Sequence, residues 1–204
     1  MKQTFKPAGR VLKGFLWVDI GLTVLLMINL LVIGFTEPGE AFLNYDLIVS
    51  LALAIIVIIY TIIYLVWLYR VHNYLQYVDS SYPITPGGAL ARVMIPIYNL
   101  YGIWNVYSTM AKHFKKKPSI REIGVRLARY VPVYYLLFLT TAIFNSYLSR
   151  QPIEEFNTSL WFISYTADIA LVIIYIMIIK IVTAGLLNFS KEENIDSGSN
   201  AHFS

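Results

Sequence analysis

The segment that decides the fold is LIVSLALAIIVIIYTIIYLVWL, residues 47–68, in which only Ser50 and Thr61 carry clearly polar side chains. A helix of these 22 residues, at about 1.5 Å per residue, extends roughly 33 Å, which is enough to cross the hydrocarbon core of a bilayer. Three more apolar runs accompany it, at residues 14–35, 130–148 and 160–187. We therefore expect an all-α integral membrane protein with four transmembrane helices.

The composition leads to the same class of protein. Of the 204 residues, 57% are hydrophobic and only 14% are charged, whereas a soluble domain keeps roughly a quarter of its residues charged. The chain has no cysteine, which excludes disulfides, thiolate metal sites and a cysteine nucleophile. The sequence also lacks a Gly-rich phosphate loop, a His-x-x-x-His pair and a Gly-x-Ser-x-Gly motif. We expect no metal, no cofactor and no enzymatic activity.

The four runs are expected to form one transmembrane domain over residues 1–189, arranged as two helical hairpins, with a disordered polar tail at 190–204. The run at 14–35 is longer than the core of a signal peptide, so we expect it to be retained. Each hairpin has a short acidic loop between its helices. The loops are Thr36–Asp46, with Glu37 and Glu40, and Ser149–Ser159, with Glu154 and Glu155.

A polar hub, residues 69–129, lies between the two hairpins. Helix-breaking residues predict that residues 80–88 are not helical; these are Pro83, Pro86, Gly87 and Gly88. From Ile97 to Phe114, apolar and aromatic residues recur at three- and four-residue steps, with Trp104 among them. This pattern predicts an amphipathic helix at the membrane interface. Ser119, with Glu122 three residues later, is expected to cap the helix of the third span.

The positive charges predict the orientation, because Lys and Arg near membrane helices are retained in the cytoplasm. With both termini inside, Arg150 is the only one of the 16 Lys and Arg residues that lies outside. The inner side then holds Lys2, Lys6, Arg10, Lys13, Arg70, Arg92, Lys112, Lys115, Lys116, Lys117, Arg121, Arg126, Arg129, Lys180 and Lys191. A fifth span over residues 89–110 would move Lys115–Lys117 outside and is disfavoured. We expect a multi-pass protein of the bacterial inner (cytoplasmic) membrane with both termini cytoplasmic.

Two acidic residues, Asp19 and Asp168, fall inside the first and fourth apolar runs. A charged side chain at the centre of a membrane helix costs about 2.5–3.5 kcal/mol on insertion scales. Two uses remain open: a proton or cation relay in a small transporter or channel, or a structural hydrogen-bonded tie to a polar residue of a neighbouring helix. In the predicted topology Asp19 lies in the inner half of the membrane and Asp168 in the outer half, so we do not expect them to share a site.

The hub carries two groups of candidate binding residues. Arg70, His72 and Asn73 follow the second span; an Arg fork pairs with phosphate or carboxylate and stacks on aromatics such as Trp67, or the group simply anchors the helix end. The basic cluster of Lys112, Lys115, Lys116 and Lys117 either recognises anionic lipid, at about 1 kcal/mol per residue, or only fixes the topology. Nucleic-acid binding is not expected.

The central stretch reads Trp67-x-x-Arg70-x-x-Asn73, then Pro86-Gly87, then Pro96-x-x-Asn99-Leu100. This pattern resembles a bacterial membrane family known as domain of unknown function 4328. The resemblance covers under a quarter of the chain, and the flanking hairpins match in layout only. It implies a small multi-span protein with this stretch facing the cytoplasm, and it implies no established activity. Gly88 and Ile103 stand where the family often has an aromatic residue and a proline, so no role is carried over to them.

Together these features predict a non-enzymatic accessory or scaffold subunit that binds a membrane partner or anionic lipid through the hub. Its expected partners are membrane lipids and a membrane protein or a second copy of the chain. The candidate binding residues are Trp67, Arg70, His72, Asn73, Pro86, Gly87, Pro96, Asn99, Trp104, Lys112, Lys115, Lys116 and Lys117. The alternative is a small transporter or channel that uses Asp19 and Asp168, and the third option is a membrane enzyme that acts on a lipid.

Overall fold

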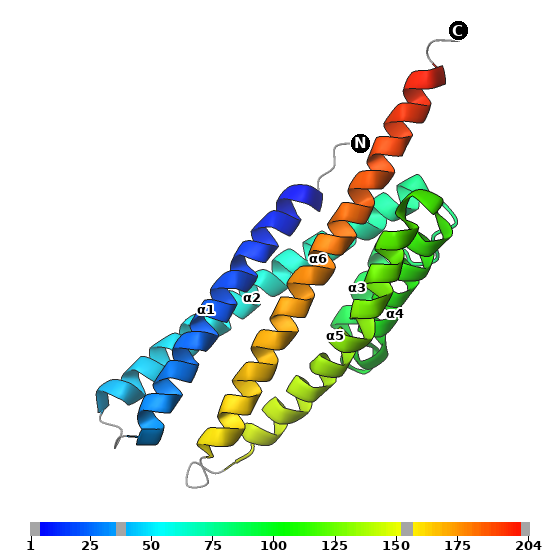
Figure 1. The fold of residues 1–204 in the computed structure, drawn as a ribbon. Helices are drawn as coiled ribbons and strands as arrows, with labels where there is room; N and C mark the ends of the chain where they lie inside the picture. Colours follow the sequence, from blue (N-terminus) through cyan, green and yellow to red (C-terminus); the bar gives the residue numbers. More distant parts are fainter. Residues whose placement is uncertain (1–4, 36–39, 152–156, 201–204) are drawn as a thin grey trace. The chain divides into compact units, whose positions relative to one another are not determined.

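The computed structural model describes residues 5–35, 40–151 and 157–200, and in these ranges every regular element is a helix (Figure 1). The long helices are α1 (Phe5–Phe35), α2 (Glu40–Val78), α4 (Pro96–Lys116), α5 (Arg121–Leu148) and α6 (Thr158–Asn200). The short elements are α3 (Pro86–Met94) and a 3₁₀ turn, η1 (Pro118–Ile120). The prediction of an all-α fold is confirmed for the described residues.

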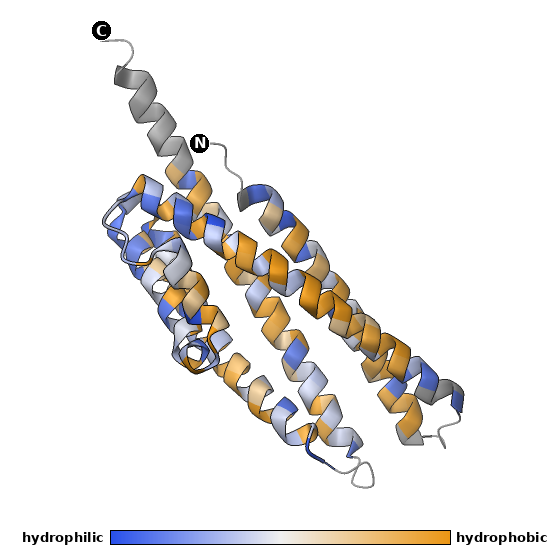
Figure 2. Ribbon diagram, turned by 180° about the vertical axis from the view of Figure 1, so that it is seen from behind, coloured by the Kyte–Doolittle hydropathy of each residue, from blue (hydrophilic) through white to orange (hydrophobic). Residues whose placement is uncertain are grey.

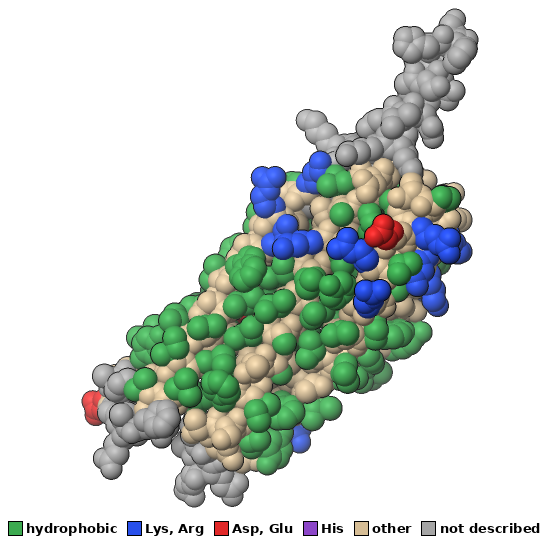
Figure 3. All heavy atoms as spheres, viewed as in Figure 1, with side chains coloured by type: hydrophobic (Ala, Val, Ile, Leu, Met, Phe, Trp, Pro, Cys, Tyr) green, Lys and Arg blue, Asp and Glu red, His purple; other side chains and the backbone are tan. Residues whose placement is uncertain are grey.

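Four helical segments are long and apolar enough to cross a membrane: Lys6–Ile33, Asn44–Val78, Pro118–Leu148 and Thr158–Phe189. Figure 2 shows long orange, hydrophobic stretches along these helices, and Figure 3 shows hydrophobic side chains over large parts of the visible surface. On α2, Leu47 and Ile48 are each 67% exposed. Contiguous apolar surface of this kind is rare on soluble monomers, and here it is suited to contact with lipid. The prediction of four apolar spans is confirmed, and the chain is a multi-pass membrane protein.

The helix ends differ from the predicted ones. α2 begins at Glu40, although residues up to Asp46 were predicted to be a loop; an acidic residue in the first turn favours the helix there. α6 continues to Asn200, into the segment predicted to be a disordered tail, and the Lys and Glu residues of that segment are good helix formers. Parts of both predicted acidic loops, with Glu37, Glu154 and Glu155, lie outside the described residues.

The predicted non-helical stretch at residues 80–88 ends earlier, at Thr85. Pro86 is the first residue of α3, where a missing backbone N–H is not needed by the helix. Thr85 caps α3, since its hydroxyl oxygen accepts a hydrogen bond of 3.0 Å from the Gly88 N–H. Pro86 and Gly87 therefore open a helix and do not extend the loop.

The start of the third span also differs from the prediction. Pro118–Ile120 forms η1, and Ser119 lies within this turn, so it does not cap α5. Lys117 holds the N-cap position of η1 without a side-chain cap hydrogen bond. Glu122 lies in the first turn of α5, where its charge complements the helix dipole.

The described chain divides into two compact units, which we treat separately. Unit 1 comprises Met1–Gly9, Leu65–Val133 and Met177–Ser204, and unit 2 comprises Arg10–Tyr64 and Tyr134–Ile176. Helices α1, α2, α5 and α6 each contribute a segment to both units. The predicted single domain and the two-hairpin arrangement stay predictions.

The core of unit 1 is built around α4. Four apolar residues predicted to share one face of this helix are buried: Ile103, Tyr107, Met110 and Phe114. Gly102 is buried as well, because α3 packs against α4 there. A Cβ atom on Gly102 would overlap the carbonyl oxygen of Arg92, so this close approach requires glycine. The location of α4 at the membrane interface stays a prediction.

Candidate functional site

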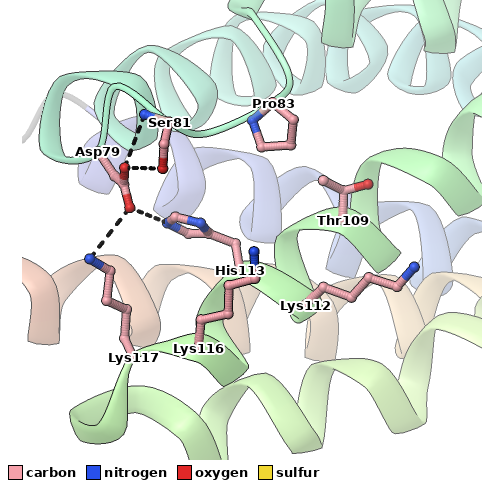
Figure 4. Close-up of a pocket in the computed structure, with 8 residues that line it drawn as sticks. All are labelled: Asp79, Ser81, Pro83, Thr109, Lys112, His113, Lys116 and Lys117. Carbon is pink, nitrogen blue, oxygen red and sulfur yellow. Dashed lines mark hydrogen bonds and ion pairs between the residues drawn. The ribbon is translucent and has the colours of Figure 1, made fainter.

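Unit 1 contains a pocket of ≈ 360 Å³ that is lined by charged and polar side chains (Figure 4). Its wall has two parts, the connection after α2 and the last turns of α4. The lining residues are Asp79, Ser81, Pro83, Thr109, Lys112, His113, Lys116 and Lys117. This set combines three lysines, a histidine and one carboxylate.

The α4 wall follows from helical spacing. Thr109, Lys112, His113 and Lys116 lie at positions i, i+3, i+4 and i+7, so they share one face of the helix. Lys115 belongs to the same basic run and is exposed like Lys112 and Lys116, but it does not line the pocket. Of the adjacent residues Lys115 and Lys116, only Lys116 therefore lines the pocket.

The opposite wall is a turn held by Asp79. Its Oδ1 accepts hydrogen bonds from the Ser81 backbone N–H at 3.0 Å and from the Ser81 hydroxyl at 2.6 Å. The Tyr82 N–H donates to the Asp79 carbonyl oxygen at 3.0 Å. An Asp side chain that bonds to its own backbone two residues on is a common means of fixing a turn.

The second carboxylate oxygen of Asp79 faces His113 of α4 and Lys117, the residue between α4 and η1. Its Oδ2 lies 3.4 Å from the Lys117 Nζ and 3.8 Å from the His113 Nε2, and dashed lines mark both contacts in Figure 4. The hydrogen bonds from Ser81 lower the pKa of Asp79 from 3.8 to about 2, and Lys117 acts in the same direction. Asp79 is therefore ionised at neutral pH.

His113 is held in a mostly apolar setting. Its ring lies edge-on to Tyr82, with centroids 5.0 Å apart, and 6.1 Å from Phe189. Burial lowers the pKa of His113; Asp79 opposes this effect, while Lys117 and Lys116 add to it. The imidazole is thus neutral near pH 7, and its Nε2 has no hydrogen-bond partner among the described residues.

A second histidine, His72, lies close to Tyr82. His72 is fully buried, and its Nδ1 donates a 3.0 Å hydrogen bond to the Leu68 carbonyl oxygen. Its ring lies 5.7 Å from Tyr82, the same tyrosine that contacts His113. Burial raises the pKa of Tyr82, so its hydroxyl stays protonated. Tyr82 therefore connects a buried histidine to the pocket.

The remaining predicted hub residues are spread through unit 1. Trp67 is fully buried in the core, Arg70 is exposed, and Asn73, Asn99 and Trp104 are partly buried. Pro86 and Gly87 form the first turn of α3, and Pro96 begins α4. Of the predicted residues, only three lysines line the pocket: Lys112, Lys116 and Lys117.

Sequence reasoning missed four polar lining residues. Thr109 and His113 were identifiable, because they share the helical spacing of Lys112 and Lys116. Asp79 and Ser81 show the spacing of an Asp-stabilised turn, two residues before Pro83. Neither signal predicts that these two segments face each other.

Unit 2 holds a separate polar cluster around Asp19 and Asp168. Asp168 acts electrostatically on Asp19, and both act on Tyr60, whereas the sequence did not lead us to expect a shared site. Their expected location in opposite halves of the membrane stays a prediction. Helix α1 begins at residue 5, well before the apolar run at residue 14. Asp19, only 6% exposed, therefore lies near the middle of its helix.

Hydrogen bonds tie the helices of unit 2 together. Asn145 on α5 donates from Nδ2 to the Asp168 Oδ1 on α6 at 3.4 Å, and the Ser164 hydroxyl donates to the Asn145 Oδ1 at 2.8 Å. Asn29 on α1 donates to Asp46 on α2 at 3.2 Å. These contacts fit the structural role that the sequence left open for intramembrane acids.

Among the described residues, no group of three His, Asp or Glu side chains is placed to hold a metal ion. Comparisons of the chain with protein-family models, with curated protein sequences and with solved structures find no match. The function is therefore argued from the pocket of unit 1 and the polar cluster of unit 2.

Proposed function

We propose that this protein is a non-enzymatic accessory or scaffold subunit of the bacterial inner membrane that binds anionic lipid headgroups through the pocket of unit 1. In this proposal both termini and the hub face the cytoplasm. The observation that carries it is the pocket itself, which Lys112, Lys116 and Lys117 line together.

The position of the pocket along the chain supports binding at the membrane surface. Val78 is the last residue of the second candidate span, and Pro118 is the first residue of the third. The residues that directly follow and precede these ends, Asp79 and Lys117, form an ion pair of 3.4 Å. A segment whose two ends meet in this way begins and ends on the same side of the membrane. This favours a hub that does not cross the bilayer, at the depth of the lipid headgroups.

The charge of the pocket supports an anionic ligand. Lysines near a membrane surface attract anionic lipids by about 1 kcal/mol each. Because Lys and Arg near membrane helices are kept in the cytoplasm, the same residues favour a cytoplasmic hub. The resemblance of the central stretch to domain of unknown function 4328 agrees with this orientation.

Native mass spectrometry of the full-length protein in a mild detergent tests lipid binding. We expect more bound phosphatidylglycerol than phosphatidylcholine, and we expect replacement of Lys112, Lys116 and Lys117 by Gln to remove this preference. A variant with Gln at Arg121, Arg126 and Arg129 is the control, since it loses the same charge outside the pocket. Equal binding of the two lipids, or an equal loss in both variants, contradicts the proposal.

The subunit part of the proposal is tested by extraction of tagged protein at its native level. A membrane protein that copurifies in fixed stoichiometry supports it. A lone monomer or a homo-oligomer contradicts it.

A second candidate function is a small transporter or channel, favoured by the interaction of Asp19 and Asp168 with each other and with Tyr60 inside a candidate membrane span. Intramembrane acids of this kind often serve proton or cation transfer. Replacement of both acids by Asn in reconstituted vesicles should abolish any cation or proton flux, whereas a scaffold keeps its lipid and partner binding.

A further inference from the structure

We infer that the pocket of unit 1 selects a phosphomonoester group, and that a phosphate oxygen takes over the contacts of the Asp79 Oδ2 with Lys117 and His113 while Oδ1 stays bound to Ser81. This inference rests on the proposed function, because it uses the same pocket, and it specifies the chemistry of the ligand. The group can belong to a lipid headgroup such as that of phosphatidic acid, or to free phosphate.

The charge of the lining matches a dianion. Lys112, Lys116 and Lys117 contribute three positive charges and Asp79 one negative charge, which leaves a net charge of +2 with His113 neutral. A phosphomonoester carries about −1.5 to −2 at neutral pH, because its second pKa is about 6. The phosphodiester of most anionic lipids carries a single negative charge and leaves the pocket unbalanced.

The Asp79 Oδ2 occupies the position of an anionic ligand, but its contacts with Lys117 and His113 are long. Its Oδ2 lies 3.4 Å from Lys117 and 3.8 Å from His113, whereas charge-assisted hydrogen bonds between N–H and O⁻ are about 2.7–2.9 Å long. Its Oδ1 is instead bound firmly to Ser81, by hydrogen bonds of 2.6 and 3.0 Å. A phosphate oxygen that enters between the Lys117 ammonium and the neutral His113 imidazole can make shorter bonds there, while the turn stays held by Ser81.

His113 supplies a position for a further hydrogen bond. Its side chain is only 8% exposed, and its Nε2 has no hydrogen-bond partner among the described residues. A buried polar atom without a partner costs about 1–3 kcal/mol, which a ligand oxygen can recover. Tyr82 fixes the ring by its edge-on contact at 5.0 Å.

The other donors lie on the same face of α4. Thr109, Lys112 and Lys116 line the cavity together with His113, and each has a side-chain donor. A phosphomonoester presents three terminal oxygens, one more than a phosphodiester, and can therefore engage more of these donors at once. The volume of ≈ 360 Å³ admits a phosphate with part of the group that it esterifies.

The test compares phosphatidic acid, phosphatidylglycerol and inorganic phosphate on the full-length protein in detergent at neutral pH. We expect phosphatidic acid to bind about tenfold more tightly than phosphatidylglycerol, since it makes one more bond to a charged group. Inorganic phosphate that competes with phosphatidic acid identifies the phosphate as the recognised group. If inorganic phosphate does not compete, tight binding of phosphatidic acid still supports the inference and identifies a lipid as the source.

Matched variants locate the binding. Lys116→Gln should weaken phosphatidic acid binding by more than about tenfold, because it removes a charged donor from the pocket. Lys115→Gln is its neighbour and control, and it should change binding by only about twofold, because Lys115 does not line the pocket. Asp79→Asn should strengthen binding by about fivefold, because it removes a like charge about 4 Å from the ligand.

The outcomes separate the two proposals. If phosphatidylglycerol binds as tightly as phosphatidic acid and both depend on Lys116, the phosphomonoester inference is wrong and anionic lipid binding stands. If Asp79→Asn weakens the binding of phosphatidic acid, the Asp79 Oδ2 does not compete with the phosphate and the inference is overturned. If Lys115→Gln and Lys116→Gln have equal effects, the pocket is not the site and both proposals fail.

Discussion

A close backbone contact between α4 and α5 gives a sharp test of how unit 1 packs. A Cβ atom added at Gly124 would lie 2.6 Å from the backbone nitrogen of Lys115 and 2.9 Å from the carbonyl carbon of Phe114. Ordinary contact begins at 3.4 Å, so α4 must move by about 0.8 Å, the difference between 3.4 and 2.6 Å, to admit Gly124→Ala. Both opposing atoms belong to the backbone, so no side chain can rotate away.

We expect Gly124→Ala to lower the free energy of unfolding by about 1–3 kcal/mol, the usual cost of overpacking a core. For a chain of this size the thermal midpoint should fall by about 2–12 °C. The change should also weaken phosphatidic acid binding, since Phe114 and Lys115 lie between the pocket residues His113 and Lys116.

Thermal unfolding of the full-length protein in one detergent measures the effect. Gly87→Ala is the control, because Gly87 is an exposed helical glycine of the same unit and a Cβ there meets nothing within 4 Å. The packing argument is refuted if Gly124→Ala unfolds at the wild-type temperature, or if the two variants behave alike.

Three further predictions concern single polar groups. Because hydrogen bonding to Ser81 lowers the pKa of Asp79 from 3.8 to about 2, its contribution to stability is complete above about pH 4 and is lost as the pH falls toward 2. Asp79→Ala should therefore lower the thermal midpoint at neutral pH, with a difference from wild type that shrinks below pH 4 in an unfolding series; a constant difference would contradict this. Ser164→Ala should lower the unfolding free energy by about 0.5–1 kcal/mol, since it removes the 2.8 Å hydrogen bond to Asn145, as measured by unfolding in SDS. Asp19→Asn should raise the unfolding free energy by about 1–3 kcal/mol in the same assay, because it removes a buried carboxylate that Asp168 repels; a loss of stability would show that the carboxylate is a structural tie.

The spans were predictable because their signal is local. A continuous apolar run such as residues 47–68 needs no distant partner to be recognised, and each of the four runs lies within a helix of the structure. The helix ends were less predictable. Proline and glycine both break helices and begin them, so Pro86 and Gly87 were assigned to a loop although Thr85 marks the start of α3.

Some features of the site were also predictable from the local sequence, and others were not. The spacing of Lys112 and Lys116 places them on one helix face, which follows from the sequence alone. The pairing of Asp79 with Lys117 depends instead on how the turn after α2 meets the end of α4, and no local pattern encodes it. The electrostatic interaction of Asp19 with Asp168 likewise depends on how distant helices pack, which the local sequence does not encode.

The direction of the charges distinguishes a binding pocket from a simple topology anchor. An anchor depends on the number of positive residues on one side of the membrane, so its lysines can point anywhere around a helix. Here Lys112 and Lys116 share a face with His113, while Lys115 points elsewhere. An anchor also gains nothing from a carboxylate beside its cations, yet Asp79 is fixed by Ser81 within 3.4 Å of Lys117. The Asp79 Oδ2 instead stands beside Lys117 where an anionic ligand can compete with it, which fits a binding pocket and not an anchor.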